Sequence, residues 1–97
     1  MSERINDIRS AVETIHQCAA RHAASVPVRE TFGDEIVWEG VVEVFDLLRH
    51  PRAIRCYAWR FFEGNEPHYV AALELPPVDS PQTAVRAAIA EKARRMT

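Results

Sequence analysis

The stretch AIRCYAWRFFE, residues Ala53–Glu63, decides the fold of this 97-residue chain. It is rich in aromatic residues, which favour β-strands because they pack well on a pleated surface. Successive side chains of a strand point to opposite faces of a sheet. One face would carry Ile54, Cys56, Ala58 and Arg60, and the other Arg55, Tyr57, Trp59 and Phe61. The stretch therefore predicts a central strand that is largely apolar on both sides.

A β-hairpin is predicted upstream of this strand. Val28–Phe32 and Glu35–Leu47 both have strand character, and Gly33-Asp34 lies between them. A two-residue loop with glycine at its first position is typical of a type II′ hairpin turn.

Pairing outward from this turn gives the expected register. It sets Thr31 opposite Ile36 and Arg29 opposite Trp38, so that the guanidinium would lie over the indole ring. Gly40 interrupts a run of strong strand formers, and we expect a bulge or a sharp bend there. A bulge would exchange the faces of all residues after it.

A fourth strand, His68–Leu75, is predicted after a turn at Gly64–Pro67. Pro76-Pro77 ends this strand, because proline has no N–H to donate to the ladder.

Helices are predicted at both ends of the chain. Ser2 or Asn6 would cap a first helix that runs to about Ala24, and Ser80 followed by Pro81 is typical of the start of a second. The first helix is indicated by residues three and four positions apart that form one stripe: Ile5, Ile8, Val12, Ile15, Ala19 and His22.

Together these elements predict one domain, residues 1–97, of the α+β class. We expect a four-stranded antiparallel meander flanked by an N-terminal and a C-terminal helix, α-β-β-β-β-α, with both helices on one face. That arrangement leaves the other face uncovered. A bare face with Tyr57, Trp59 and Phe61 would be a larger apolar patch than monomers usually expose.

We therefore expect a second copy of the chain to associate with the sheet, either sheet to sheet or edge to edge, since symmetric dimers are the commonest oligomers. A ligand platform and a strongly curled sheet that buries both faces are the alternatives. The predicted partner or ligand face consists of Arg55, Tyr57, Trp59 and Phe61.

We expect a small cytoplasmic, bacterial-type module that acts by association. The formal net charge of −2 argues against a general polyanion binder. The polar start MSERINDIRS has no apolar core typical of a signal peptide, and no apolar run is long enough for a membrane helix.

A nucleic-acid-binding module is the first alternative. The outline resembles that of double-stranded RNA-binding domains, α-β-β-β-α, although residues 80–83, Ser-Pro-Gln-Thr, lack the lysines that this family carries at the start of its second helix. Arginine and aromatic side chains on a sheet could instead stack on unpaired bases. The sheet face with Arg55, Tyr57 and Trp59, or the loop Leu48–Arg52, would make these contacts. The secondary candidates for a partner or ligand face are Arg29, Trp38, His50 and Arg52.

A small-molecule-binding protein or enzyme with a pocket between sheet and helices is the second alternative. His50 and His68 would be its candidate bases, but the sequence offers no partner for either. Cys18 and Cys56 fit neither a disulfide framework nor a zinc site, and the His16, Cys18 and His22 spacing matches no metal motif. We therefore expect no catalytic residue, no metal and no other cofactor.

Overall fold

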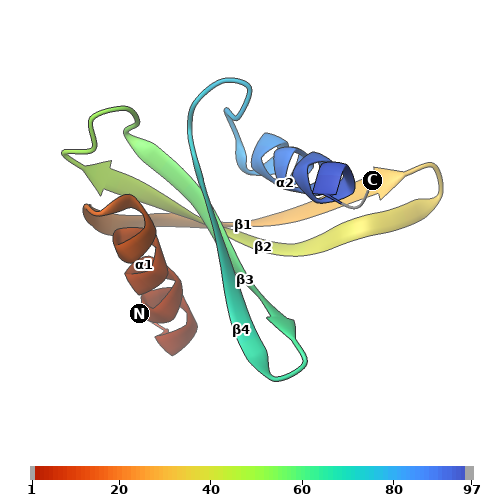
Figure 1. Cartoon of the computed structure of the whole chain (residues 1–97), viewed down its shortest axis with the longest axis horizontal. Helices are drawn as coiled ribbons and strands as arrows, with labels where there is room; N and C mark the ends of the chain where they lie inside the picture. Colours follow the sequence, from red (N-terminus) through yellow and green to blue (C-terminus); the bar gives the residue numbers. More distant parts are fainter. Residues whose placement is uncertain (1, 96–97) are drawn as a thin grey trace.

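The fold is a helix, four antiparallel strands in one open sheet, and a second helix. The computed structural model describes residues 2–95, and the strands lie in the order β1-β2-β3-β4 across the sheet (Figure 1). This confirms the predicted α+β class and element order. The elements are α1 (Glu3–His16), β1 (Ala19–Phe32), β2 (Glu35–Leu48), β3 (Arg55–Glu63), β4 (Glu66–Leu73) and α2 (Pro81–Arg95).

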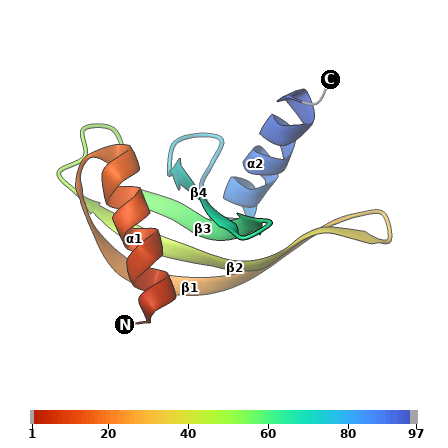
Figure 2. The ribbon, with the colours of Figure 1, turned by 60° about the horizontal axis from the view of Figure 1, so that its bottom comes forward.

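The two helices lie on opposite faces of the sheet, so the prediction that both cover one face is wrong (Figure 2). Ile8 of α1 packs in one core cluster with Cys56, whereas Val85 of α2 packs in another with Trp59. Residues 56 and 59 of a strand point to opposite faces. The segment between β4 and α2 carries the chain across, with Val78 buried in the second cluster. The sheet therefore receives both of its covers from its own chain.

The first helix is shorter than predicted. It ends at His16, and Gln17 adopts the left-handed conformation, φ 54° and ψ 44°, that often ends a helix. The first strand begins at Ala19 rather than at Val28. Its first residues have good helix propensity, but they pair with the end of β2, and such tertiary pairing overrides local preference.

The turn between β1 and β2 agrees with the prediction. Gly33 has φ +61°, and Asp34 after it keeps an ordinary negative φ, as a type II′ turn requires. Thr31 pairs with Ile36, as expected from this turn.

Beyond Thr31 the register differs from the prediction. A shift leaves Val37 without a partner, so Arg29 faces Glu39 and not Trp38. The predicted stacking of Arg29 on Trp38 is therefore wrong. Arg29 instead forms an exposed ion pair with Glu39, with Nη2 and Oε2 2.7 Å apart.

The bulge predicted at Gly40 is also wrong, because Gly40 pairs regularly with Val28. The second irregularity of this ladder lies between His22 and Ala24. Gly40 instead makes room for the Trp38 ring, which lies against the backbone there. A Cβ atom at position 40 would lie 3.1 Å from Cη2 of Trp38.

The strands β3 and β4 form a second hairpin, each shifted slightly from its expected range. β3 begins at Arg55 rather than Ala53, and β4 runs from Glu66 to Leu73 rather than from His68 to Leu75. Pro67 lies within β4, which tolerates proline because it is an edge strand.

The second helix begins as predicted and packs on the first hairpin. Ser80 Oγ accepts a hydrogen bond from Thr83 N over 3.1 Å, which makes Ser80 the N-cap. Farther along, Arg86 Nε donates to Glu30 Oε1 of β1 over 2.9 Å.

The two hairpins diverge from a short junction (Figure 1). β2 pairs with β3 only from the Glu43–Ala58 pair to the Asp46–Arg55 pair. Beyond Glu43 the β1–β2 hairpin, residues 26–42, continues alone as an arm beside α2, while the β3–β4 hairpin turns away from it.

Candidate functional site

The four residues predicted as a partner face do not form one open surface. Tyr57 is 3% exposed and Trp59 is 4% exposed, because α2 and its cluster cover them. Trp59 also contacts Trp38, with ring centroids 5.5 Å apart. Arg55 is exposed and pairs with Asp46, its Nε 3.4 Å from Oδ1. Phe61, 40% exposed, is the one large apolar side chain of the four that reaches solvent.

The secondary candidates lie at two ends of the molecule. Arg29 and Trp38 belong to the arm, and Arg29 is already engaged with Glu39. His50 and Arg52 lie in the loop between β2 and β3. The structure therefore does not bring these residues together as a nucleic-acid surface.

The predicted candidate bases are each held by other contacts. His50 Nδ1 accepts hydrogen bonds from the backbone N–H groups of Arg52 and Ala53, over 3.0 and 3.1 Å, which orders the loop. His68 stacks on Phe61 with ring centroids 5.3 Å apart. These contacts give both histidines a structural role.

The two cysteines lie near one another in the cluster beneath α1. Cys56 is fully buried, and burial raises the pKa of its thiol to about 12, with Cys18 as a second cause. Cys18 follows the end of α1 and does not lie on the helix as predicted. A thiol with such a pKa is a poor nucleophile at neutral pH.

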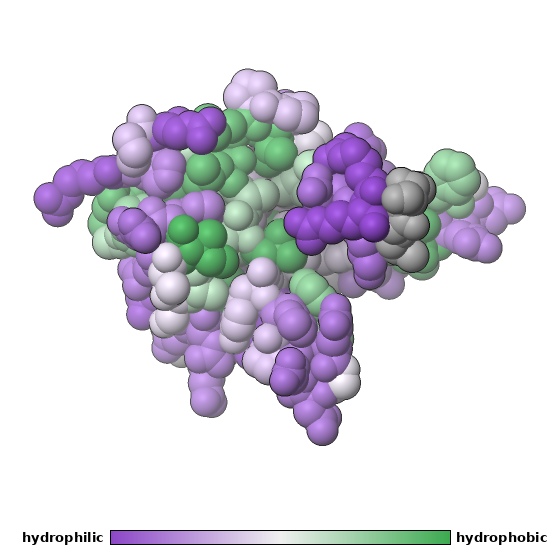
Figure 3. Space-filling model, in the orientation of Figure 1, coloured by the Kyte–Doolittle hydropathy of each residue, from purple (hydrophilic) through white to green (hydrophobic). Residues whose placement is uncertain are grey.

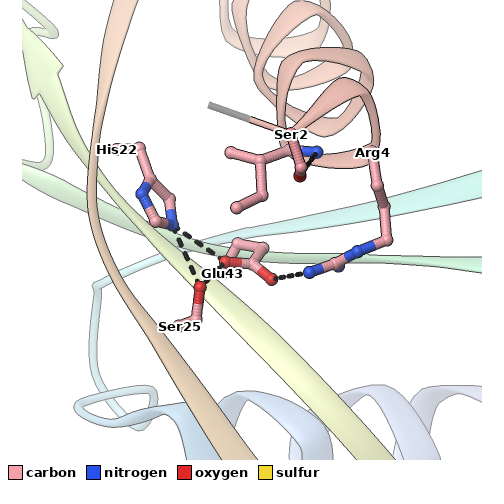
Figure 4. Close-up of polar contacts among 6 residues, drawn as sticks. Ser2, Arg4, His22, Ser25 and Glu43 are labelled. Carbon is pink, nitrogen blue, oxygen red and sulfur yellow. Dashed lines mark hydrogen bonds and ion pairs between the residues drawn. The ribbon is translucent and has the colours of Figure 1, made fainter.

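A buried carboxylate that the sequence analysis did not single out as a site lies beneath the start of α1. Glu43 of β2 is 0% exposed, and three side chains donate hydrogen bonds to it (Figure 4). Arg4 Nη2 lies 2.8 Å from Oε2, His22 Nε2 lies 2.8 Å from Oε1, and Ser25 Oγ also donates to Oε1. The cluster joins α1, β1 and β2.

These hydrogen bonds keep the Glu43 carboxyl ionised. Burial by itself would raise its pKa, but the hydrogen bonds from Ser25, His22 and Arg4 together hold the pKa below its ordinary value of 4.5. The charge of Arg4 acts in the same direction. Glu43 is thus a buried negative charge with its donors in place.

The geometry of this cluster does not match a nucleophile–base relay. Glu43 Oε1 and Ser25 Oγ both approach the same ring nitrogen, Nε2 of His22, at 2.8 and 3.3 Å. A catalytic triad places its acid and its nucleophile on different nitrogens of the histidine. The Ser25 hydroxyl is moreover committed to the carboxylate. The arrangement anchors α1 to the sheet.

A different kind of site lies at the outer edge of β4. Glu74 N donates to Arg55 O over 2.9 Å, and this pair fixes which residues of β4 face β3. In an antiparallel ladder alternate residues turn their N–H and C=O groups to the neighbouring strand and the others turn them away. Pro67, Tyr69 and Ala71 are therefore outward-facing positions.

One of these outward groups is already occupied. His16 Nε2 lies 3.2 Å from the carbonyl oxygen of Ala71, at the end of α1. Within residues 2–95 the Tyr69 N–H and C=O, the Ala71 N–H and the Pro67 C=O have no such partner. The edge thus presents two donors and two acceptors in a row.

An open groove of about 590 Å³ runs beside this edge. One wall is α1 and the other is the first half of β4. The helix contributes small and polar side chains together with the exposed Ile15. The lining residues are Asp7, Ser10, Ala11, Thr14, Ile15, Pro67, His68 and Tyr69.

The end of the arm is a second exposed region. Phe32 is 81% exposed, and Ile36 and Val37 beside it are also exposed. Figure 3 shows hydrophobic side chains at the far end of the arm, on the right of the view. A groove of about 270 Å³ between Phe32 and Ile89 separates the arm from α2.

Comparison with known proteins does not assign the chain to a group: no family model, no curated protein and no solved structure matches it. Among residues 2–95 no helix has the length and apolar character needed to cross a membrane.

Proposed function

We propose that this chain is a non-catalytic association module that takes up an extended polypeptide strand along the outer edge of β4. The observation that carries the proposal is the row of unpaired backbone groups at Pro67, Tyr69 and Ala71. Addition of a strand to a sheet edge is a recurring mode of recognition in which main-chain hydrogen bonds supply the affinity. The contact surface is thus a sheet edge, since α2 covers Tyr57 and Trp59 on the sheet face.

The other edge of the sheet is protected along more of its length than β4, in which the proline, Pro67, and the charged Glu66 lie at the start of the strand. β1 carries an irregularity between His22 and Ala24 and has Pro27 near its middle. Bulges, prolines and charged residues are the devices by which proteins prevent unwanted strand pairing. From Tyr69 to Leu73, by contrast, β4 is regular and has no charged residue.

The groove beside α1 supports the same function. A strand added at Tyr69 would place every second side chain on the α1 side of the sheet. The groove provides space there, because the α1 residues that line it include the small side chains of Ser10, Ala11 and Thr14. Affinity from the backbone and side-chain selection by a groove are the two parts of strand recognition.

Amide hydrogen exchange of Tyr69 and Ala71 tests the proposal. The probe is a short extended peptide of alternating threonine and valine with a lysine at each end, added to dilute protein. A second series uses the protein alone at rising concentration. Outward N–H groups exchange quickly when they are free and slowly when they are bonded. We expect both amides to exchange more slowly in at least one series.

A matched pair of variants identifies the edge. Ala71→Pro removes an outward N–H that no strand of the same chain uses, so the fold should persist and the protection at Tyr69 should be lost. Ala71→Ser keeps the N–H and should retain the protection. Free exchange of both amides in both series would contradict the proposed function.

A further inference from the structure

We infer that the strand taken up on the β4 edge is β4 of a second copy of this chain, paired antiparallel about a twofold axis at Tyr69. This inference rests on the proposed function and adds the identity of the partner. Twofold pairing requires a surface that is complementary to itself. The outward N–H groups of β4 must therefore meet outward C=O groups of a second β4 that runs in the opposite direction.

With Tyr69 opposite the partner's Tyr69, the hydrogen bonds close in symmetric pairs. Each Tyr69 N–H meets the carbonyl oxygen of the other, because the residues of a hydrogen-bonded antiparallel pair exchange both bonds. Two positions away, the Ala71 N–H of each copy meets the Pro67 carbonyl of the other. All the free outward groups between Pro67 and Ala71 are then used.

The two outward positions of this edge that cannot take part in a new backbone hydrogen bond also lie opposite each other. Pro67 has no N–H, and in this register it stands opposite the carbonyl of the partner's Ala71. That carbonyl already accepts a hydrogen bond from His16 of its own copy, over 3.2 Å. The one missing donor therefore faces the one occupied acceptor. An arbitrary peptide strand would offer an N–H at the occupied position and leave it unbonded, so this edge suits itself better than it suits a general partner.

The surroundings of the edge are compatible with this pairing. A twofold axis perpendicular to the sheet places both α1 helices on the same side of a continuous sheet. The open groove separates α1 from the edge, which leaves room for the partner's Tyr69 side chain. In this register Glu66 of each copy lies opposite the partner's Ala72 and His68 lies opposite the partner's Val70, so no like charges face each other, which would otherwise oppose pairing.

Light scattering of the purified chain at rising concentration provides the first test. We expect a mass of twice 11.0 kDa for the chain and for Ala71→Ser. Ala71→Pro removes two symmetric hydrogen bonds, so it should weaken the dimer by at least about tenfold while the circular dichroism stays unchanged.

Cysteine crosslinking tests the register itself. In the proposed pairing His68 lies opposite the partner's Val70 at a non-hydrogen-bonded position, where Cα atoms are about 4.5 Å apart and a disulfide can form. The variants His68→Cys and Val70→Cys are prepared on a Cys18→Ser background, with the buried Cys56 retained. Under mild oxidation we expect a crosslinked dimer in a mixture of the two variants, and much less from either variant alone.

The possible results distinguish a failure of self-pairing from a failure of strand uptake on the β4 edge. A monomer at the highest concentration, with Tyr69 and Ala71 protected by the Thr/Val peptide, overturns self-pairing and leaves strand uptake standing. A dimer that survives Ala71→Pro and gives no crosslink in the mixture lies elsewhere on the molecule and overturns the inference. Free exchange of both amides under all conditions overturns both.

Discussion

The two faces of this sheet are covered by helices of similar length that are attached in different ways. On the α1 side the core contains Phe45 and Cys56 together with the ionised Glu43, which is bonded to Arg4 at the start of the helix. On the α2 side the core is made by Trp59 and its apolar neighbours. The first helix is held by a directional polar cluster as well as by apolar area. The second depends chiefly on apolar area, with its polar contacts at the surface.

Removing the indole of Trp59 should have the largest effect. Trp59→Ala deletes a side chain that is 4% exposed and contacts Trp38, so we expect a loss of about 3–5 kcal/mol of unfolding free energy. Urea unfolding followed by circular dichroism measures this loss. Phe61→Ala is the matched control, because Phe61 lies on the same strand and face and is 40% exposed. A cost for Phe61→Ala equal to that for Trp59→Ala would show that α2 does not bury the indole.

Neutralising Glu43 should have an intermediate effect. Glu43→Gln keeps the size of the side chain but removes the negative charge to which Arg4 and His22 donate hydrogen bonds. We therefore expect a loss of about 1–3 kcal/mol of unfolding free energy. Chemical unfolding at neutral pH provides the measurement. Glu39→Gln on the same strand breaks only the exposed pair with Arg29 and should cost about 0–1 kcal/mol. Equal losses in the two variants would mean that the cluster does not stabilise the attachment of α1.

Acid should destabilise the chain through Glu43 on the α1 face, and alkali should destabilise it through Tyr57 on the α2 face. The Glu43 carboxyl has a lowered pKa in the folded chain, so its contribution is present above about pH 4.5 and is lost as the pH falls through the folded value. Burial, followed by Glu74, raises the pKa of Tyr57 to about 12 from 10.0, so its contribution is present below pH 10 and is lost as the pH rises toward 12.

Unfolding of the parent chain, Glu43→Gln and Tyr57→Phe across this pH range checks the assignment. The stability difference between the parent chain and Glu43→Gln should shrink in acid. Tyr57→Phe should reduce the alkaline loss without abolishing it, because the pKa of Cys56 is also raised to about 12. A Glu43→Gln difference that is constant down to pH 2 would be inconsistent with a lowered Glu43 pKa.

Adding a methyl group at position 40 should have the smallest effect. Gly40→Ala restricts the unfolded chain, which favours folding, but it brings a Cβ atom to 3.1 Å from the Trp38 ring. We expect a net loss of about 1 kcal/mol or less. Thermal unfolding measures it. In a Trp38→Ala background the loss should disappear, and its persistence there would show that the indole is not its cause.

The order of the elements could be predicted from local signals. The runs of strand-forming residues, the Gly33-Asp34 turn and the Ser80-Pro81 helix start each act within a few residues, and all three agree with the structure. The end of α1 could not be predicted in this way. Ala19–Ala24 has the composition of a helix, and only its pairing with β2 makes it a strand.

The sequence indicated that the sheet needs two covers, and it did not indicate where the second cover comes from. Both faces of β2 and β3 are indeed apolar. The segment between β4 and α2, in which Val78 is buried, brings α2 to the face opposite α1. The partner predicted for the face of Tyr57 and Trp59 was inferred from a bare surface that the chain covers itself. Association as such remains a prediction, now directed to another surface.

The candidate sites were hidden for related reasons. Glu43 and His22 are separated by 21 positions, and no spacing rule connects them once His22 is assigned to a helix. The site on the β4 edge consists of backbone N–H and C=O groups, which no side-chain motif in the sequence indicates. One signal was available: the run from Tyr69 to Leu73 has no charge, which is unusual for an exposed edge strand.

The short junction between the hairpins has a consequence for how the chain folds. Each strand pairs only with its neighbours in sequence, and the β2–β3 ladder spans just the pairs from Glu43–Ala58 to Asp46–Arg55. Contacts close in sequence form with little loss of chain entropy, so each hairpin can form early and independently. Joining them then depends on this small ladder and on the helices that pack over it. The transition state for folding should therefore contain residues 43–46 of β2 paired with residues 55–58 of β3. The slow step should be the docking of two preformed hairpins, and not the formation of either hairpin.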